Sequence, residues 1–302
     1  MINRRIFMMG GLAVAGLGIT GMSACTRTET GTGAPAGEGD LLTRLQEAGK
    51  ITVGFAGEAP YSFEEGGELT GATVALHREI FSSLGIDEVE GVSTDFGSLI
   101  PGLNANRFDA VSAGMSILPE RCAQAAFSEP EFMYTTALMV PTGNPEGLQN
   151  MQSFVDSPLT VATMTGAIET DYAASLGLDN IEVAGPQDGL DAVVSGRAAA
   201  FALTAISLNW MAENGNAEGV EVTESFEAEI DGLRQVGAGA TVFRNQDTSL
   251  LDAYNEKLAE IVSDEERYLS IVGEYGFTAE ERPNNPDLTT ALLCEGDLEA
   301  LQ

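Results

Sequence analysis

Strand-like and helix-like segments alternate along the chain from residue 51 onward. Residues 51–55 alternate apolar and small side chains, which is typical of a strand. Residues 72–84 carry apolar side chains at helical spacing before Gly85, and a shorter helix is predicted at 98–103. The next strand is predicted at 108–112. This β-α-β-α-β order with short connections predicts an α/β fold with a parallel sheet flanked by helices.

The alternation starts again after Pro145 and gives a second α/β unit. It predicts strands at 159–163, 181–184 and 199–203, and helices at 168–175, 189–195 and 206–212. A further strand and two helices follow at 237–244, 248–262 and 265–275. Ligands of open α/β sheets bind beyond the carboxyl ends of the strands. Two facing units therefore predict a ligand cleft between two lobes.

Polar and aromatic residues follow the predicted strand ends of the first unit. An arginine binds a carboxylate through two parallel hydrogen bonds, a carboxylate pairs with a cation, and aromatic faces attract a diffuse cation. This combination suits a small zwitterion, and the alternative for each single residue is a surface ion pair or core packing. The candidate site residues in this unit are Glu58, Tyr61, Phe96, Gly114, Ser116 and Arg121.

Acidic residues dominate the charge of the chain. There are 46 Asp and Glu residues against 14 Lys and Arg, which gives a formal net charge of −32. Such a chain repels phosphate backbones, so we expect no nucleic-acid partner. The acidic residues are spread along the sequence, which favours a solvated, self-repelling surface over a functional acidic patch. Adaptation to a salty environment is a further hypothesis.

Histidine and cysteine are scarce, with one and three residues respectively. No CxxC or HxxxH spacing is present, so we expect no metal site, and no P-loop or dinucleotide fingerprint points to a cofactor. His77 lies between Leu76 and Arg78, and we interpret it as a solvent-side residue of the predicted helix. Catalysis would need an acid/base pair such as Glu58 with His77, so we expect a binding protein rather than an enzyme.

The N-terminus is typical of an export signal. Residues 1–24 contain Arg4 and Arg5 before a short apolar run, which resembles a twin-arginine signal, with Sec export as the alternative. The segment Met-Ser-Ala-Cys ending at Cys25 resembles a lipobox, which predicts a lipidated cysteine; the alternative is a simple signal peptide. Residues 25–40 would then form a flexible tether. We expect an extracytoplasmic protein that a lipid holds at the cell membrane.

The part of the chain after the expected tether contains two cysteines, Cys122 and Cys294. Two cysteines in an oxidising compartment usually form a disulfide, and the alternative is two separate buried thiols. A bridge between them would connect the turn after Arg121 to the C-terminal tail.

Four segments together resemble the family 3 extracellular solute-binding proteins of ABC importers. They read ITVGFAGEAPYSF, GELTGATVALHREIF, FGSLIPGLNANRFDAVSAGMSILPERCAQAAFSEP and VATMTG. The resemblance implies a periplasmic-binding-protein type II fold, in which two α/β lobes are joined by a two-segment hinge and close on a ligand. It places the crossovers near 134–137 and 237–240. Residues 41–136 and 241–302 would form lobe 1, and 137–240 would form lobe 2.

The segments GEAPY, VEGVSTDFGSLIPGL, PERC and LLC resemble the ectoine/hydroxyectoine-binding subgroup more closely. The resemblance implies that Arg121 holds the ligand carboxylate. It also implies that Glu58 faces the cyclic amidinium cation and that Tyr61 and Phe96 line it. The disulfide between the PERC cysteine and the tail cysteine fits the same subgroup.

Two positions depart from the patterns of related binders. Ser116 stands where some members of the subgroup have a third aromatic residue, and it resembles the Ser or Thr of amino-acid binders. Thr204 stands where amino-acid binders usually have an Asp that holds the α-ammonium group, and losing a charge-assisted bond of about 1.5–3 kcal/mol argues against an ordinary α-amino acid. In the second unit, backbone N–H groups near Gly166 and Ile168 could meet a carboxylate, with Glu169 close by.

We therefore expect a monomeric, lipid-anchored receptor that delivers an ectoine-like zwitterionic solute to the permease subunits of an ABC importer. A polar amino-acid receptor on the same fold is the first alternative. An enzyme on this fold and the sensing domain of a membrane receptor are the others.

Overall fold

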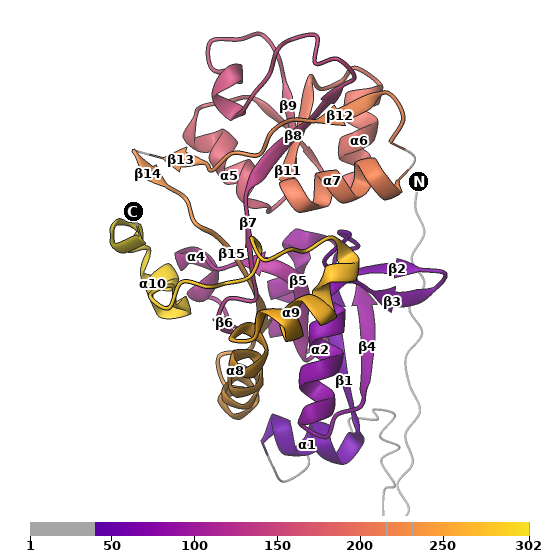
Figure 1. Ribbon diagram of the computed structural model, residues 1–302, viewed down its shortest axis with the longest axis vertical. Coiled ribbons are helices and arrows are strands. Elements are labelled where there is room, and N and C mark those ends of the chain that lie inside the picture. Colours follow the sequence, from indigo (N-terminus) through magenta and orange to yellow (C-terminus); the bar gives the residue numbers. More distant parts are fainter. Residues whose placement is uncertain (1–39, 216, 231, 302) are drawn as a thin grey trace, which may run out of the picture. The chain divides into compact units, whose positions relative to one another are not determined.

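The computed structural model of the protein describes residues 40–215, 217–230 and 232–301 (Figure 1). The expected signal peptide, Cys25 and the tether up to residue 39 lie outside the described residues. Asp40, the last residue of that expected tether, caps helix α1 (Leu41–Ala48) by accepting a hydrogen bond from the backbone N–H of Thr43 at 2.9 Å. Within the described residues, no helix is long and apolar enough to cross a membrane.

The first sheet combines parallel and antiparallel strands. Its order is β4-β1-β5-β15-β6, and β7 also pairs with β15. Strand β1 is parallel to β4 and β5, whereas β15 runs antiparallel to β5, β6 and β7. The strands are β1 (Lys50–Phe55), β4 (Glu88–Ser93), β5 (Ala110–Ser116), β6 (Ala126–Phe127), β7 (Phe132–Tyr134) and β15 (Gly237–Phe243). The parallel part agrees with the prediction from the sequence.

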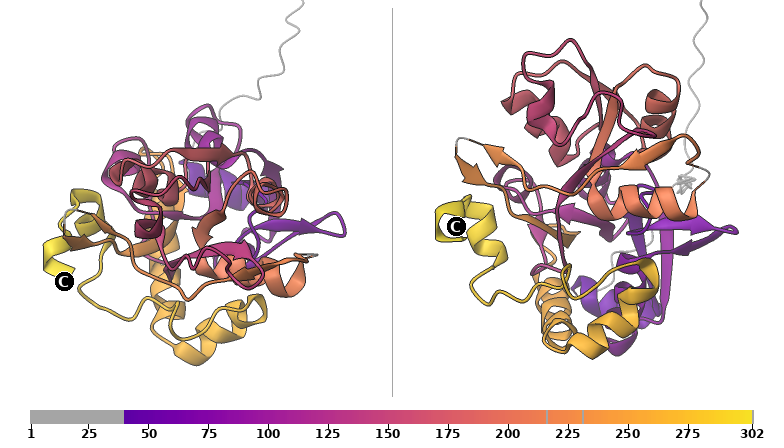
Figure 2. Two further views of the ribbon diagram at one scale, coloured as in Figure 1. Left: turned by 90° about the horizontal axis from the view of Figure 1, so that it is seen from above. Right: turned by 45° about the horizontal axis from the view of Figure 1, so that its top comes forward.

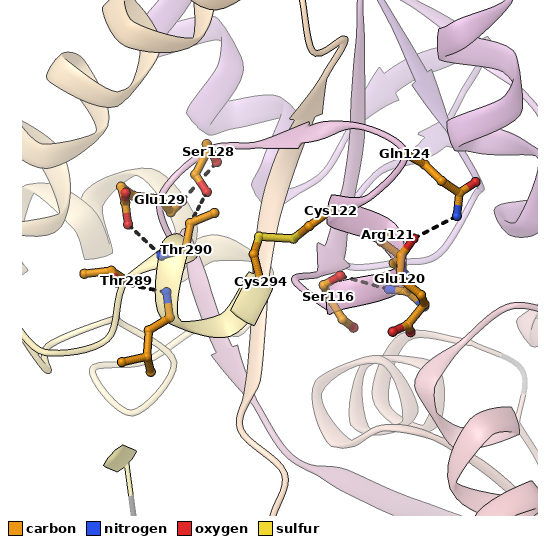
Figure 3. The surroundings of a disulfide bond; sticks show 11 residues. Ser116, Glu120, Arg121, Cys122, Gln124, Ser128, Glu129, Thr289, Thr290 and Cys294 are labelled. Carbon is orange, nitrogen blue, oxygen red and sulfur yellow. Dashed lines mark hydrogen bonds between the residues drawn. A yellow bond between two sulfur atoms is a disulfide. The ribbon is translucent and has the colours of Figure 1, made fainter. Parts of the chain in front are cut away.

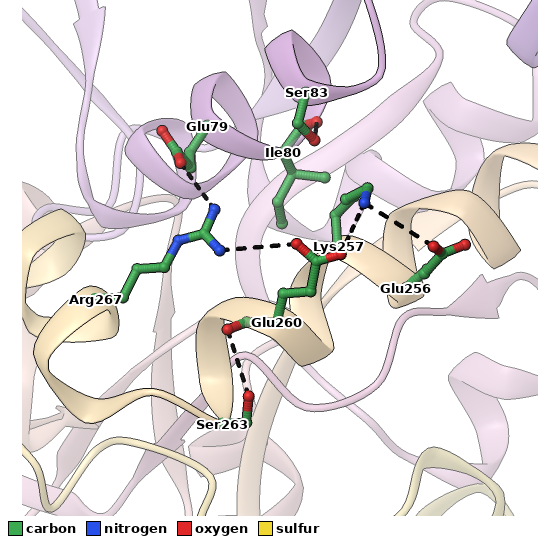
Figure 4. A network of polar contacts seen from close by, with 8 residues as sticks. All are labelled: Glu79, Ile80, Ser83, Glu256, Lys257, Glu260, Ser263 and Arg267. Carbon is green, nitrogen blue, oxygen red and sulfur yellow. Dashed lines mark hydrogen bonds and ion pairs between the residues drawn. The ribbon is translucent and has the colours of Figure 1, made fainter.

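Helices cover the first sheet, and some of them share an apolar core with strand β1. This core includes Ile51, Leu76, Phe81 and Tyr254, none of which is exposed. The helices of this part are α2 (Ala72–Ser83), α3 (Leu99–Asn104), α4 (Pro119–Cys122), α8 (Thr248–Val262), α9 (Glu265–Val272) and α10 (Thr290–Glu295), with 3₁₀ turns η1 (Phe96–Ser98), η3 (Gly273–Tyr275) and η4 (Leu298–Leu301). Arg267 of α9 ties three helices together, because it contacts Glu79 of α2 at 3.0 Å and Glu260 of α8 at 3.8 Å (Figure 4).

The second sheet has the order β10-β9-β11-β8-β12. Strand β9 is parallel to β10 and β11, and β8 is antiparallel to β11 and β12. The strands are β8 (Thr136–Pro141), β9 (Val161–Met164), β10 (Asn180–Val183), β11 (Ala200–Thr204) and β12 (Val220–Val222). The helical elements are η2 (Met151–Phe154), α5 (Ile168–Ser175), α6 (Pro186–Val194) and α7 (Ala205–Asn214).

The chain passes between the two sheets twice. Only Thr135 separates β7 of the first sheet from β8 of the second. The return runs from β12 through the short hairpin of β13 (Glu229–Ile230) and β14 (Leu233–Arg234) into β15. Strand β15 pairs with the first sheet from Gly237 onward. On this basis we propose the lobe division 41–136 with 241–302 and 137–240.

Helix α7 lies beside the hairpin of β2 (Phe63–Glu65) and β3 (Glu68–Thr70) in both sets of views (Figures 1 and 2). The contact is aromatic, because the rings of Phe63 on β2 and Trp210 on α7 are 5.9 Å apart. The sequence prediction did not include this hairpin.

His77 is buried, so its interpretation as a solvent-side residue is wrong. Its exposed fraction is 0%, and its Nε2 shares a hydrogen bond with Thr241 Oγ1 at 2.6 Å. Its ring also meets Phe81 and Tyr254 at 5.4 and 5.8 Å. Helix α2 is covered by α8 and α9 as well as by the sheet, so the face that carries His77 never reaches water.

The structure joins Cys122 of α4 and Cys294 of α10 in a disulfide, as expected (Figure 3). Thr290 reinforces this attachment, because its Oγ1 donates to the Ser128 carbonyl at 2.6 Å and its N–H donates to Glu129 Oε2 at 3.0 Å. The C-terminal helix is thereby fixed beside the turn that carries Arg121.

Candidate functional site

A small buried cavity is lined by residues from both sheets. Its volume is about 20 Å³, which is enough for about one water molecule. The sequence-predicted site residues that line it are Glu58, Tyr61, Phe96, Gly114, Ser116, Ile168, Glu169 and Thr204. We call it the central cavity. Arg121 and Gly166, the other two predicted site residues, lie next to it and contact its wall.

Arg121 connects the two sides of the central cavity. Its Nη1 donates to the Ser116 carbonyl at 3.0 Å and its Nη2 donates to the Gly166 carbonyl at 2.8 Å. Its Cζ lies 5.7 Å from the centre of the Phe96 ring, within cation–π range. Among the described residues no carboxylate forms a salt bridge with Arg121, although it is only 7% exposed. Burial lowers the pKa of Arg121, but a guanidinium remains protonated in proteins.

Glu58 follows β1 and reaches across to the second sheet. Its Oε1 accepts hydrogen bonds from Ser207 Oγ of α7 at 2.7 Å and from Thr204 Oγ1 at 3.5 Å. Burial raises the pKa of Glu58 to about 7, with a smaller contribution from the charge of Glu169, while the two hydroxyl donors act in the opposite direction. The carboxylate is thus held in place by the second unit and faces the cavity.

Glu169 lies in the first turn of α5 and is 1% exposed. Its Oε1 accepts a hydrogen bond from Thr136 Oγ1 at 3.1 Å, whereas its Oε2 is buried without a hydrogen-bond partner. Burial raises the pKa of Glu169 to about 7, while hydrogen bonds from its own backbone N–H and from Thr136, and then the charge of Arg121, oppose this shift. The cavity therefore contains two buried carboxyl groups.

Aromatic rings form much of the remaining wall. Tyr61 meets Tyr134 edge-on at 6.3 Å, and its hydroxyl is buried without a partner. The Tyr134 hydroxyl donates to Ser116 Oγ. Gly114 has a φ of +54°, and a Cβ there would lie 2.4 Å from the Tyr61 ring, so the wall requires glycine at this point.

Sequence reasoning missed three polar residues that complete the site. Tyr134 lies on β7 and lines the cavity, while Thr136 and Ser207 donate to the two carboxyl groups. Ser207 lies one helical turn after Thr204, so its position beside a predicted site residue was a usable signal. Tyr134 and Thr136 flank the first crossover, which the sequence analysis treated only as a hinge.

The arrangement can bind both signs of charge. It offers an arginine with no carboxylate salt bridge among the described residues, two buried carboxyl groups and aromatic faces at one small cavity. The described residues contain no group of His, Cys, Asp or Glu side chains that could hold a metal ion.

Comparison with known proteins decides the family. Residues 51–275 match the bacterial extracellular solute-binding proteins, family 3. The chain belongs to this family. A family 3 relative described as "Probable amino-acid ABC transporter periplasmic-binding protein", from Sinorhizobium fredii, is 35% identical over 260 residues, which cover 84% of this chain and 85% of the relative. The lysine/arginine/ornithine-binding periplasmic protein of Escherichia coli is 26% identical over 216 residues, covering 68% and 79%.

Solved structures of this family agree with the fold. The crystal structure of EhuB in complex with hydroxyectoine has a TM-score of 0.75 and 32% sequence identity, covering 85% of this chain and 99% of EhuB. An ancestral arginine-binding protein bound to glutamine has a TM-score of 0.66 at 25% identity, covering 75% and 97%. These proteins confirm the periplasmic-binding-protein type II fold. This family 3 member is a solute-binding protein of an amino-acid-type ABC transporter, and its relatives are transport proteins rather than enzymes.

Proposed function

We propose that the protein captures ectoine, hydroxyectoine or a similar cyclic zwitterionic solute in the central cavity and delivers it to the permease of its ABC importer. The observation that carries this proposal is the presence of Arg121 and the buried carboxyl group of Glu58 at one cavity with aromatic rings, where no described carboxylate forms a salt bridge with Arg121. Such a site offers one partner for an anion and one partner for a cation.

Arg121 is the proposed partner of the solute carboxylate. Two of its N–H groups are used by backbone carbonyls, which fix the orientation of the guanidinium plane. A guanidinium has five N–H donors, so three remain. Because a buried cation needs an anion, a ligand carboxylate supplies what the protein does not.

Glu58 is the proposed partner of the cation. Tyr61 and Phe96 line the same cavity, and aromatic faces favour a delocalised cation such as a cyclic amidinium. Thr204 and Ser207 direct their hydroxyls to Glu58, so the position where amino-acid binders have an Asp supports the glutamate here. EhuB, solved with hydroxyectoine, supports the same class of ligand.

A polar amino acid is the alternative solute. The hydroxyl of Ser116 and the relatives described as amino-acid transport proteins favour it. In the structure, however, Ser116 Oγ accepts the Tyr134 hydroxyl. This bond leaves Ser116 less capacity for an ammonium group.

Solute entry requires the two sheets to separate. A cavity of about 20 Å³ is too small for any of these solutes, and the Glu58–Ser207 and Arg121–Gly166 bonds bridge its two sides. We propose that the two crossovers act as a hinge, which opens the site and closes it again around the solute.

We also propose that the mature protein is a monomer held at the outer face of the cell membrane by a lipid on Cys25. The motif before Cys25 supports this. Metabolic labelling with radioactive palmitate tests it: the wild-type chain should carry label and Cys25→Ser should not. A Cys25→Ser chain that still carries label would contradict the anchor, and size-exclusion chromatography with light scattering tests the monomer.

Isothermal titration of the mature chain carrying Cys25→Ser tests the solute. Ectoine, hydroxyectoine, proline betaine, glutamine, glutamate, histidine and arginine form the panel. We expect tight binding of the ectoines alone, and a loss of about 2–5 kcal/mol for Arg121→Ala because the carboxylate loses a buried charged partner. Arg107→Ala, at an exposed arginine, is the matched control. Binding of an α-amino acid alone would overturn the solute assignment.

A further inference from the structure

The central cavity contains one more acidic group than a zwitterion needs. Glu58 and Glu169 both line it, and Arg121 is the cation that contacts its wall. With both carboxyl groups ionised, these three side chains carry a net charge of −1. A zwitterion adds no charge, so one buried negative charge would stay uncompensated, and such charges are costly.

The hydrogen bonds distinguish the two carboxyl groups. Glu58 Oε1 accepts from Ser207 Oγ at 2.7 Å, and Thr204 Oγ1 donates to the same Ser207 oxygen at 3.0 Å, so a chain of two hydroxyls stabilises the ionised form of Glu58. Glu169 accepts from one hydroxyl at Oε1, and its Oε2 has no partner although it is buried. A proton on Oε2 removes the unpaired charge and turns this oxygen into a donor.

The position of Glu169 places that donor near the expected carboxylate. Arg121 contacts the carbonyl of Gly166, three residues before Glu169 and just ahead of α5. A solute carboxylate bound by Arg121 would therefore lie near the start of α5. A carboxylic acid donates a strong, short hydrogen bond to a carboxylate.

We propose that Glu169 is protonated in the complex and donates a hydrogen bond from Oε2 to the solute, so that the site selects solutes with no net charge. This proposal rests on the proposed function, because it takes the solute to be a zwitterion. A solute of net charge +1, such as arginine, would balance the site with both carboxyl groups ionised. Proton occupancy of Glu169 therefore acts as a selectivity element.

Several charged and titratable groups surround Glu169. Arg121 on α4 favours its ionised form, and Asp171 on α5 disfavours it. Glu58 faces it across the cavity, and Tyr134 on β7 is neutral because burial raises its pKa. A second cavity, of about 340 Å³, shares Ser116, Tyr134, Ile168 and Glu169 with the central cavity. The other acidic or phenolic groups that line these two cavities are Tyr61, Glu120, Tyr172 and Glu227. Apart from Arg121, these groups are acidic or neutral, and it is mainly burial that raises the pKa of Glu169 to about 7.

The expected pH dependence follows from the sign of that shift. Below its raised pKa Glu169 already holds the proton, so a zwitterion binds without proton uptake by Glu169, while Glu58, whose pKa is also about 7, gives up its proton to pair with the solute cation. Above this pKa the Glu169 carboxyl group of the unliganded protein is ionised, so solute binding must be accompanied by proton uptake. The affinity for a zwitterion should then fall by up to about tenfold per pH unit.

Calorimetric titration of hydroxyectoine in phosphate and in Tris measures proton uptake, because the two buffers release different heats on ionisation. At about pH 8 we expect uptake approaching one proton by the wild type and close to none by Glu169→Gln. At about pH 6 Glu169→Gln should keep its affinity within about threefold, because its amide also donates. Glu120→Gln, at an exposed acid of the same rim, is the matched control and should behave as wild type.

Absence of proton uptake at about pH 8 would overturn the proposal, and so would a loss of more than tenfold in Glu169→Gln at about pH 6. If no ectoine binds, the proposed function fails. A measurement without ligand still decides whether Glu169 holds a proton near neutral pH. The titration curve of the wild type minus that of Glu169→Gln should show a midpoint near 7. A midpoint near the ordinary glutamate value of about 4.3 would overturn the proposal.

Discussion

Ser207 Oγ on α7 donates a hydrogen bond to Glu58 Oε1 at 2.7 Å, which joins a helix of the second sheet to the loop that follows β1. The two residues are 149 positions apart and both are buried, with exposed fractions of 0% and 4%. This bond sets the direction in which the Glu58 carboxylate points. It also contributes to closure, because it exists only when the two sheets approach each other.

Ser207→Ala should weaken solute binding by about 5- to 100-fold. Removing the hydroxyl leaves a buried carboxylate oxygen with only the long bond from Thr204, a loss of about 1–3 kcal/mol. Isothermal titration with the best-binding solute measures the effect. Ser270→Ala, at an exposed serine of α9, is the control. Equal affinity of the Ser207→Ala and Ser270→Ala variants would show that Glu58 does not depend on Ser207.

Gly114→Ala should disrupt the central cavity. Its φ is +54°, and a Cβ would lie 2.4 Å from the ring of Tyr61, which is buried and packs edge-on against Phe132. We expect destabilisation of several kcal/mol, since overpacking adds to backbone strain. Gly143→Ala separates these contributions: its φ is +82° but nothing lies within 4 Å of the added Cβ. It should lose only about 1–2 kcal/mol in urea unfolding, and equal losses in both variants would contradict the clash.

Loss of the disulfide should destabilise the protein. The bridge spans 172 positions, and chain entropy assigns such a loop about 5 kcal/mol. Urea unfolding with and without reductant should therefore differ for the wild type. The double variant Cys122→Ser/Cys294→Ser should unfold at the same urea concentration as the reduced protein, and reductant should not change its unfolding curve. Two titratable thiols in unfolded, unreduced mature protein would contradict the bridge.

His77 should make the protein less stable in acid. Burial lowers its folded-state pKa from 6.5 to about 3, so between these values only the unfolded chain binds the proton. The contribution of His77 is complete above about pH 6.5 and is lost as the pH falls towards 3. The maximum loss is roughly 5 kcal/mol. His77→Gln, which cannot take up this proton, should lose less stability between about pH 6 and 4; parallel stability curves would contradict a neutral buried His77.

Strong periodicity made most of the fold predictable. Helices α5 and α8 have the predicted bounds, and in α8 buried apolar residues recur at helical spacing. Strand β5 was expected at 108–112 but runs over Ala110–Ser116, since the chain stays buried and paired with β15 as far as Ser116. Strand β4 was not located, because this edge strand is largely exposed and lacks an apolar alternation.

The site was predictable only where residues follow strand ends. The polar and aromatic residues after β1 and β5 could be placed on one rim by this rule alone. Ser207, Tyr134 and Thr136 reach the site through packing of distant segments, which no local pattern encodes. The interpretation of His77 as a solvent-side residue was wrong for the same reason, because a second layer of helices buries a helix face that reads as polar in the sequence.

A crystal structure of the mature chain with hydroxyectoine tests the central claim most directly. The account predicts the solute carboxylate within hydrogen-bond distance of the Arg121 guanidinium, and the ring cation between Glu58 and the aromatic rings of Tyr61 and Phe96. A solute bound with its carboxylate away from Arg121, or outside the central cavity, would contradict it.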